Sequence, residues 1–390
     1  MYTAAVIAEY NPFHNGHAYH LQKTRAAGVD AVIAVMSGSF VQRGEPAAFS
    51  KWARAEAAVR CGADLVLELP VYWATAGAQR FAQGAVSVVK HTGLAQMLSF
   101  GSECGDADRI ARAARIVDNL KIPESLLRSG MLFAKAREEA VRALDSEAAE
   151  LLRMPNDTLA VEYAVAAERC GFRTELLAVK RIGMHDGVPE SGFASASHIR
   201  ANLSSPDVLS YCPAQSAEVL CREMRDGRAP ASLRCMERAL ILRLRSMSAE
   251  QIARLPDVSE GLENRILDAA KRASSMEELL ASAKTKRYSH ARLRRIVLSA
   301  LLRIDSADIP QDVPYLRVLA IGRRGKELLH EMKQTADIPI ITNPSQIDGS
   351  DDAAARTFLA EYRASEVYAM LLPRIIPSGS ERTQPVFVLP

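Results

Sequence analysis

Short apolar runs alternate with amphipathic stretches through the first half of this chain. The runs are brief and largely rich in Val, Ile and Leu, a pattern that predicts buried β-strands. They span residues 3–8, 30–36, 63–69, 96–100 and 174–179. Helical patterns between and after them predict helices over residues 17–26, 51–61, 76–91, 106–119 and 157–170. This alternation predicts an α/β fold, a Rossmann-like doubly wound parallel sheet whose ligand binds beyond the carboxyl ends of the strands.

The pattern changes after residues 203–214, a stretch with two prolines that is the best candidate for a linker. Beyond it, helices are expected over residues 215–225, 233–247, 262–274 and 287–304. A small βαβ element (315–321, 326–333 and 338–342) and a final helix (352–372) are expected to close the chain. Because 390 residues exceed one ordinary core, we expect two domains, residues 1–208 and a mainly helical domain of residues 209–390.

Composition indicates a soluble globular protein, since 48% of the residues are hydrophobic and 24% are charged. The formal net charge of +3 neither requires nor excludes an acidic partner. Six cysteines without a Cys-x-x-Cys pair argue against a zinc ribbon or a disulfide framework and fit a reducing cytoplasm. Without a basic leader or an uncharged apolar stretch of roughly 18 residues, we expect neither a signal peptide nor a membrane span.

The first candidate for chemistry is the heptapeptide of residues 11–17, Asn-Pro-Phe-His-Asn-Gly-His, which joins the first strand to the next helix. His14 and His17 are three residues apart and fall on one side of a helical turn. At a helix start they lie beside unpaired backbone N–H groups, and Gly16 allows a nucleotide to approach the backbone closely. The motif predicts a polyphosphate site; a pair of surface histidines at a helix cap is the alternative. No third ligand at zinc-site spacing accompanies the pair, so no metal site is predicted.

A second candidate is the segment of residues 195–200, Ser-Ala-Ser-His-Ile-Arg, just before an expected helix. The hydroxyls of Ser195 and Ser197 could donate to phosphate oxygens, and Arg200 would supply a forked, permanently charged clamp. The alternative is a serine helix cap followed by a solvated arginine. Gln42, Arg43 and Lys51 follow the second strand and belong either to the active-site edge or to a surface turn.

His14-Asn15-Gly16-His17 resembles the H-x-G-H signature of the HIGH-type nucleotidyltransferases. The longer string of residues 9–17 resembles the bacterial tRNA(Met) cytidine acetate ligase family, as do the stretches 36–47, 63–70 and 100–103. The Ser-x-Ser-x-Ile-Arg segment also resembles one in the nucleotidyltransferases, although His198 stands where a smaller residue is expected and is given no role. The resemblance covers residues 1 to about 203 and continues more loosely afterwards.

The resemblance implies a tRNA-modifying ligase in the cytoplasm. It would activate acetate with ATP as acetyl-adenylate and acetylate N4 of the wobble cytidine of elongator tRNA(Met), with Mg²⁺ accompanying the nucleotide. His14, His17 and Arg200 would be catalytic. Residues that would contact ATP are Ile7, Ala8, Glu9, Tyr10, Asn11, Pro12, Phe13, His14, Asn15, Gly16, His17, Ala18, Tyr19, His20, Gly101, Asn156, Arg181, Ile182, Ser195, Ser197, Ile199 and Arg200.

A basic stretch in the second half is the candidate tRNA contact, with a purely solvated face as its alternative. Its members are Lys284, Lys286, Arg287, Arg292, Arg294 and Arg295. A smaller basic turn, residues 322–326, is suited to one phosphate. Two other functions stay open, a nucleotidyltransferase that adenylylates a small metabolite and a non-catalytic RNA-binding protein. The sequence leaves the oligomeric state open.

Overall fold

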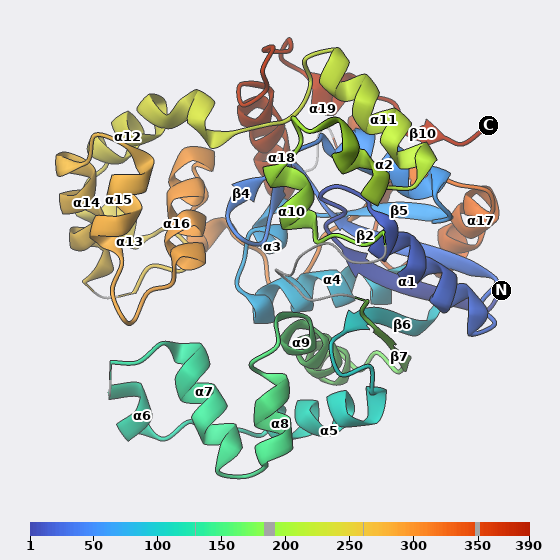
Figure 1. The fold of residues 1–390 in the computed structure, drawn as a ribbon, viewed down its shortest axis with the longest axis horizontal. Helices are drawn as coiled ribbons and strands as arrows, with labels where there is room; N and C mark the ends of the chain where they lie inside the picture. The colour runs from blue at the N-terminus through green and yellow to red at the C-terminus, as the bar shows by residue number, and fades with distance from the viewer. Residues whose placement is uncertain (129, 183–191, 260, 348–351) are drawn as a thin grey trace.

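A mostly parallel sheet forms the centre of the molecule (Figure 1). The computed structural model describes residues 1–128, 130–182, 192–259, 261–347 and 352–390. Within these residues the sheet has eight strands in the order β10-β8-β5-β2-β1-β6-β7, with β9 also paired to β8. The predicted parallel strands are β1 (Thr3–Ala8), β2 (Ala31–Ser37), β5 (Leu65–Leu69), β6 (Ala95–Ser102) and β7 (Glu175–Lys180). The α/β fold class predicted from the sequence is confirmed.

Helices cover both faces of the sheet, which explains why its central strands are continuously apolar. One face packs against α4, α5 and α9, and the other packs against α1 and α2. Each of these helices overlaps a predicted one. Their bounds are α1 (Asn15–Ala26), α2 (Lys51–Arg60), α4 (Ala78–Thr92), α5 (Ala107–Asp118) and α9 (Pro155–Arg169).

Several short elements of the first half were not predicted, because each is shorter than the window that reveals a periodicity. They are β3 (Phe40–Val41), β4 (Glu45–Pro46), α3 (Val71–Ala74), α6 (Glu124–Arg128), α7 (Phe133–Arg142) and α8 (Ser146–Leu151). After β7 the chain forms α10 (Ala196–Ala201) and a 3₁₀ helix (Pro206–Tyr211). The stretch expected to be a linker is packed, since Val208 and Cys212 are buried in one apolar cluster with Phe49 and Ile199.

The second half begins with a helical segment that has its own apolar core. Helices α12 to α16 contribute to this core, whereas α11 packs against α2. The elements are α11 (Ala214–Arg225), a 3₁₀ turn (Leu233–Met236), α12 (Glu237–Arg245), α13 (Ala249–Ala253), α14 (Leu262–Arg272), α15 (Met276–Ala283) and α16 (His290–Leu302). In Figure 1 the α12–α16 group lies to the left of the sheet.

The C-terminal residues return to the sheet. β8 pairs antiparallel with β5, and β9 and β10 pair parallel with β8. The sheet therefore contains strands from both sides of the boundary expected at residue 208. The elements are two 3₁₀ turns (Ser306–Asp308 and Pro344–Ile347), β8 (Leu316–Ile321), α17 (Gly325–Thr335), β9 (Ile340–Ile341), α18 (Ala353–Ala369), α19 (Ser380–Thr383) and β10 (Phe387–Val388). The expected βαβ element and final helix are present.

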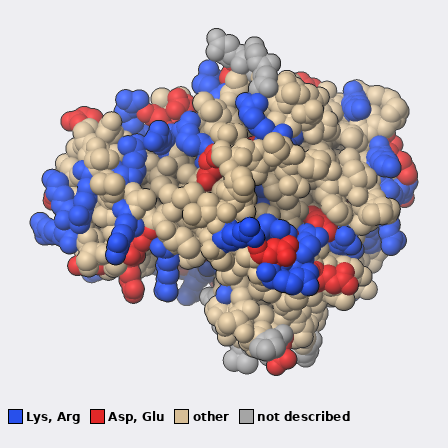
Figure 2. All heavy atoms as spheres, turned by 90° about the horizontal axis from the view of Figure 1, so that it is seen from above, with Lys and Arg blue, Asp and Glu red and all other residues tan. Residues whose placement is uncertain are grey.

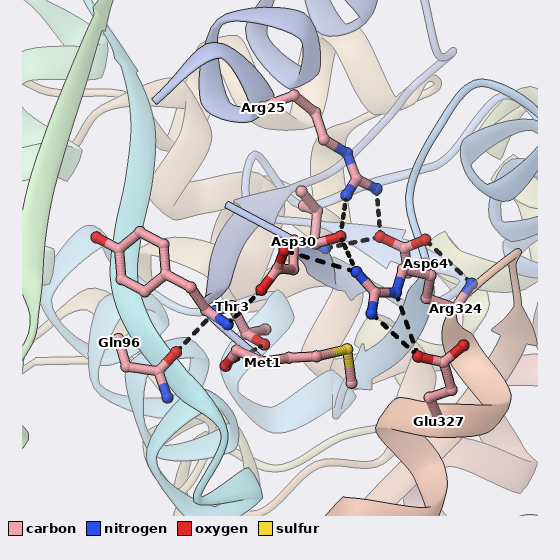
Figure 3. A network of polar contacts seen from close by, with 10 residues as sticks. Met1, Thr3, Arg25, Asp30, Asp64, Gln96, Arg324 and Glu327 are labelled. Carbon is pink, nitrogen blue, oxygen red and sulfur yellow. Dashed lines mark hydrogen bonds and ion pairs between the residues drawn. The ribbon is translucent and has the colours of Figure 1, made fainter. Parts of the chain in front are cut away.

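Figure 3 shows how this C-terminal part is attached at the amino-terminal ends of the strands. Asp64 accepts hydrogen bonds from the backbone N–H of Val32 at 2.8 Å and from that of Arg324 at 3.2 Å, and it also pairs with Arg25. The Arg324 guanidinium contacts Glu327 at 3.2 Å. The side chain of Arg324 in the small basic turn is thus used to hold the fold. No helix among the described residues is long and apolar enough to cross a bilayer.

Candidate active site

The two motif histidines are held by the start of α1. His14 is the N-cap residue, and its Nδ1 accepts the backbone N–H of Gly16 at 3.0 Å. His17 Nδ1 accepts the backbone N–H of His14 at 3.2 Å, and the two rings are stacked with centroids 3.8 Å apart. A Cβ on Gly16 would lie 2.8 Å from His14 Cε1, so the glycine makes room for this arrangement. Just before the motif, Tyr10 has a φ of 46°, a sparsely populated conformation for a residue other than glycine.

The hydrogen bonds define which ring nitrogen carries the proton. Because Nδ1 of both His14 and His17 accepts a backbone N–H, the hydrogen of each neutral ring is on Nε2. Burial, followed by the charges of Arg181 and Arg200, lowers the pKa of His14 to about 3. Burial also lowers the pKa of His17 well below its ordinary value and that of His20 to about 4. Without a ligand, both rings of the motif are therefore neutral Nε2–H donors rather than imidazolium cations.

We predict that His14 and His20 do not titrate between pH 8 and pH 5, because their pKa values of about 3 and about 4 lie below this range. The folded-state pKa lies below the unfolded value of 6.5, so their contribution to stability is present above pH 6.5 and is lost as the pH falls toward the folded value. Long-range ¹H–¹⁵N correlation spectra of histidine-labelled protein should show both rings neutral throughout, with His14 as the Nε2–H tautomer. A titration midpoint near pH 6.5 for either ring would contradict the assignment.

The histidines line a cavity of about 500 Å³ at the carboxyl ends of β1, β6 and β7. The structure brings to it side chains from segments that are distant in the sequence. Predicted ATP contacts that line it are Ile7, Ala8, Glu9, Tyr10, Asn11, His14, Gly16, His17, Tyr19, His20, Gly101, Asn156, Arg181, Ile182, Ser195 and Arg200. Six other predicted contacts do not line it: Pro12, Phe13, Asn15, Ala18, Ser197 and Ile199.

Asn156, Arg181 and Gly101 meet where β6 and β7 end. Asn156, at the start of α9, donates its side-chain amide to Glu103 at 2.5 Å. Arg181 Nη1 donates to Asn156 Oδ1 at 3.5 Å, and its side chain packs beside Gly101, where a Cβ would lie 3.7 Å from Arg181 Cγ. From the local sequence alone, each of these three residues would be read as an ordinary helix cap or surface residue. The family resemblance, not the pattern, singled these positions out.

The second motif divides into one residue that faces the cavity and several that build the fold. Arg200 lines the cavity and donates from Nη1 to the carbonyl oxygen of Asn11 at 2.7 Å and from Nη2 to Ser197 Oγ at 3.3 Å. Ser195 Oγ accepts the backbone N–H of His198 at 3.2 Å and so caps α10. Ile199 is buried in an apolar cluster. Ser195 thus has the helix-cap role that was the alternative, although it also lies at the cavity wall.

Other cavity residues were missed by sequence reasoning. They are aromatic side chains and cations on elements that carry no recognisable motif: Phe81, Phe100, Tyr163, Arg153 and Lys180. Lys180 directly precedes Arg181 at the end of a predicted strand, which was a usable signal. The aromatic residues lie on apolar patterns that read only as core, so their exposure to a cavity could not be predicted.

The basic stretch does not form one continuous cationic helix. α16 begins at His290, so Lys284, Lys286 and Arg287 lie in the exposed turn before it. The three predicted arginines within α16 contact other parts of the protein. Arg295 pairs with Asp257 at 2.6 Å, Arg292 donates to the carbonyl oxygen of Asp257 at 2.8 Å, and Arg294 pairs with Glu45 at 3.2 Å.

Figure 2 views the molecule from the top of Figure 1. Lysine and arginine side chains gather over its left part, where Figure 1 places α12–α16. A positive surface is therefore present on the helical segment. Separately, Lys284, Lys286 and Arg287 are the exposed members of the predicted set. Such a surface suits a polyanion.

Comparison with known proteins gives a consistent result along the whole chain. The family model for HIGH nucleotidyl transferases matches residues 1–382. The chain is 37% identical to the tRNA(Met) cytidine acetate ligase of Thermoanaerobacter sp. (strain X514), with 98% of this chain and 99% of that protein covered. It is 35% identical to the protein of the same name from Acetivibrio thermocellus, with 100% of both chains covered.

Solved structures agree with this result. The crystal structure of Thermotoga maritima TmcAL bound with alpha-thio ATP has a TM-score of 0.92 and 33% sequence identity over 100% of both chains. The apo form of that protein has a TM-score of 0.93. By its sequence, its fold and the histidine motif at its cavity, this chain belongs to the tRNA(Met) cytidine acetate ligase family of HIGH nucleotidyl transferases.

Proposed function

We propose that this protein activates acetate with ATP as acetyl-adenylate and transfers the acetyl group to N4 of the wobble cytidine of elongator tRNA(Met). The products are N4-acetylcytidine, AMP and pyrophosphate. One observation carries the ATP-dependent part. Arg200 Nη1 donates to the carbonyl oxygen of Asn11, 189 residues away, at 2.7 Å, so the two motifs that we predict to bind phosphate meet at one cavity. Full-length similarity to proteins named for this reaction supports the rest.

In the first step an acetate oxygen attacks the α-phosphorus of ATP and pyrophosphate leaves. The Nε2–H groups of His14 and His17 would donate to the phosphate oxygens that gain charge, and Arg200 would stabilise the departing pyrophosphate. Arg181 adds a second guanidinium at the cavity wall. The protein performs no covalent chemistry here, so its contribution is position and preorganised charge.

We expect Mg²⁺ to arrive with the nucleotide and to be held mainly by its phosphates and water. The described residues contain no group of three or more His, Cys, Asp or Glu side chains arranged to bind a metal ion. We therefore propose that Mg²⁺ is bound through the nucleotide and not at a separate protein site. A tRNA substrate is consistent with the cytoplasmic location expected from the sequence.

One assay tests the proposed function directly. The protein is incubated with ATP, radiolabelled acetate and total bacterial tRNA, and the tRNA is digested to nucleosides. Label is expected in N4-acetylcytidine, with AMP formed in equal amount. ATP consumption without labelled tRNA would favour a nucleotidyltransferase acting on a small metabolite. If no ATP is consumed, the result would favour a non-catalytic RNA-binding protein.

The exposed basic turn gives a second prediction. Changing Lys284, Lys286 and Arg287 together to Glu is expected to weaken tRNA binding and to flatten its dependence on salt. Each lost contact with a duplex phosphate should reduce the slope of log K against log salt by about 0.9. Acetate-dependent ATP–pyrophosphate exchange should persist, because these residues do not line the nucleotide cavity.

A matched control has the same change in charge at another place. Arg323, Lys326 and Lys333 are exposed on or beside α17, on the opposite side of the sheet from α12–α16 in Figure 1. Their reversal to Glu should alter tRNA binding much less. If the two triple variants weaken tRNA binding equally, the binding depends only on the net charge of the protein. The basic turn would then not be the tRNA surface.

A further inference from the structure

One acidic residue faces a cavity that otherwise suits anions. Among the described residues that line it, Glu9 is the only carboxylate. The cationic side chains of the wall are Arg43, Arg153, Lys180, Arg181 and Arg200. A carboxylate repels both triphosphate and acetate, so Glu9 is the one predicted ATP contact whose charge does not suit that role.

Glu9 is held firmly at the end of β1. Its Oε1 accepts the backbone N–H of Gln42 at 3.0 Å, and its carbonyl oxygen accepts from Arg54 Nη1 at 2.6 Å. The second carboxylate oxygen, Oε2, receives no hydrogen bond from the described residues. The carboxylate is therefore oriented through one oxygen and offers the other to a ligand.

Gln42 places a donor beside this acceptor. It lines the same cavity, and its side-chain nitrogen Nε2 is buried without a hydrogen-bond partner among the described residues. Buried amide donors are almost always satisfied, so a ligand acceptor is the natural partner. The Gln42 backbone N–H bonds to Glu9 Oε1, so the two residues are neighbours in the cavity wall, one with a carboxylate acceptor and the other with a buried, unpaired amide donor.

This pair lies on the side of the cavity that faces the helical segment. Gln42 precedes the turn between β3 and β4, and a Cβ on Gly44 in that turn would lie 2.5 Å from the backbone nitrogen of Arg295 in α16. Glu45 of the same turn pairs with Arg294. The part of the cavity wall that carries Gln42 thus adjoins α16 of the helical segment, on which the tRNA is proposed to bind.

We propose that Glu9 and Gln42 recognise the Watson–Crick edge of the target cytosine, with Glu9 also accepting the N4 proton during acetyl transfer. The inference rests on the proposed function. Cytosine presents an N4–H donor beside an N3 acceptor, which matches a carboxylate beside an amide nitrogen. Uracil presents the reverse order, so the same pair disfavours it.

The chemistry balances without another reactant. The N4–C bond forms to the acetyl carbonyl carbon, and the bond between that carbon and the phosphate oxygen of AMP breaks. AMP leaves with the electron pair of that bond, and the N4 proton passes to Glu9 Oε2. Burial raises the pKa of Glu9 above its usual value, against the opposing effects of the Gln42 N–H and of Arg200, Arg54 and Arg43, which suits a proton acceptor.

Glu9→Gln tests the role of the carboxylate, since its amide oxygen can still accept the Gln42 N–H. Both half-reactions are measured, because Glu9 is also a predicted ATP contact; acetate-dependent ATP–pyrophosphate exchange is expected to fall much less than transfer does. Transfer from supplied acetyl-adenylate to tRNA should slow by about 10²–10⁴-fold, the usual contribution of a general base. Gln42→Met should show the same pattern with a smaller loss, about tenfold. Glu9→Asp, which keeps a carboxylate, should transfer faster than Glu9→Gln.

Glu45→Gln is the control, because this carboxylate belongs to the same turn and does not line the cavity; both half-reactions should be normal. Equal loss of both half-reactions in Glu9→Gln, with an altered Mg²⁺ requirement, would assign Glu9 to the nucleotide and overturn the inference. Normal transfer in Glu9→Gln would also overturn it. Failure of the proposed function is distinguishable, since the wild-type protein would then form no acetylcytidine.

Discussion

His14→Asn is expected to slow acetate-dependent ATP–pyrophosphate exchange by about 10²–10³-fold, the usual effect of removing one preorganised donor from a site of developing charge. The choice of asparagine separates chemistry from folding. Asparagine is among the best N-cap residues, so an acceptor for the Gly16 N–H is retained. The imidazole Nε2–H, which reaches further into the cavity, is lost.

The unfolding transition should therefore stay near that of the wild type while exchange collapses. His14→Ala should lose exchange as well and should also lose about 1 kcal/mol of stability with the cap. His198→Asn is the matched control, because His198 does not line the cavity and packs edge-on against Tyr211. Normal exchange in His14→Asn would mean that His14 is only a helix cap.

The largest effect on stability is expected from Lys51→Met. The Lys51 ammonium is 1% exposed and lies 2.6 Å from both Glu68 and Glu381 and 3.8 Å from Glu361. These carboxylates come from β5, α19 and α18, so one cation joins the C-terminal helices to the sheet. Burial lowers the pKa of Lys51, but the three carboxylates outweigh burial and raise it, which keeps the ammonium charged.

Removing this cation leaves three buried carboxylates without their partner, at a cost of about 3–5 kcal/mol in the free energy of unfolding. The cost should depend on pH. Burial, and the neighbouring carboxylates, already raise the pKa of Glu361, and loss of Lys51 raises it further. Because the folded-state pKa of Glu361 is higher in the variant than in the wild type, the deficit of the variant grows as the pH rises above the wild-type folded pKa and shrinks as the pH falls.

Urea unfolding at pH 8 and at pH 5.5 measures both effects. The deficit of Lys51→Met should be larger at pH 8. Lys326→Met provides the control, since Lys326 is exposed on α17 and its loss should change little. If the free energy of unfolding of Lys51→Met is within about 1 kcal/mol of the wild-type value at both pH values, the prediction is wrong. The three glutamates would then be protonated in the variant with little loss of stability.

The candidate site was only partly accessible from the sequence. His14, His17 and Arg200 were identifiable because motifs at strand–helix turns are local, and their residue types suit phosphate. Gly101, Asn156 and Arg181 came only from the family resemblance, and the structure places them at the same cavity. The basic stretch was predicted to contact tRNA, with a solvated face as the alternative, yet Arg292 and Arg295 contact Asp257. Charge along a sequence does not reveal which partners fold back onto it.

The sequence by itself determined the five parallel strands and the helices that cover them, because continuously apolar runs are stable only when both faces are buried. It also predicted that the two histidines of the first strand–helix turn belong to a ligand site, and the structure places them at the cavity. Tertiary structure alone decided that β8 completes the sheet beside β5, that Lys51 is buried among three glutamates and that Glu9 stands beside Gln42. Such pairings join residues far apart in the chain, and their free energy comes from desolvation and geometry in the assembled core, which no local pattern encodes.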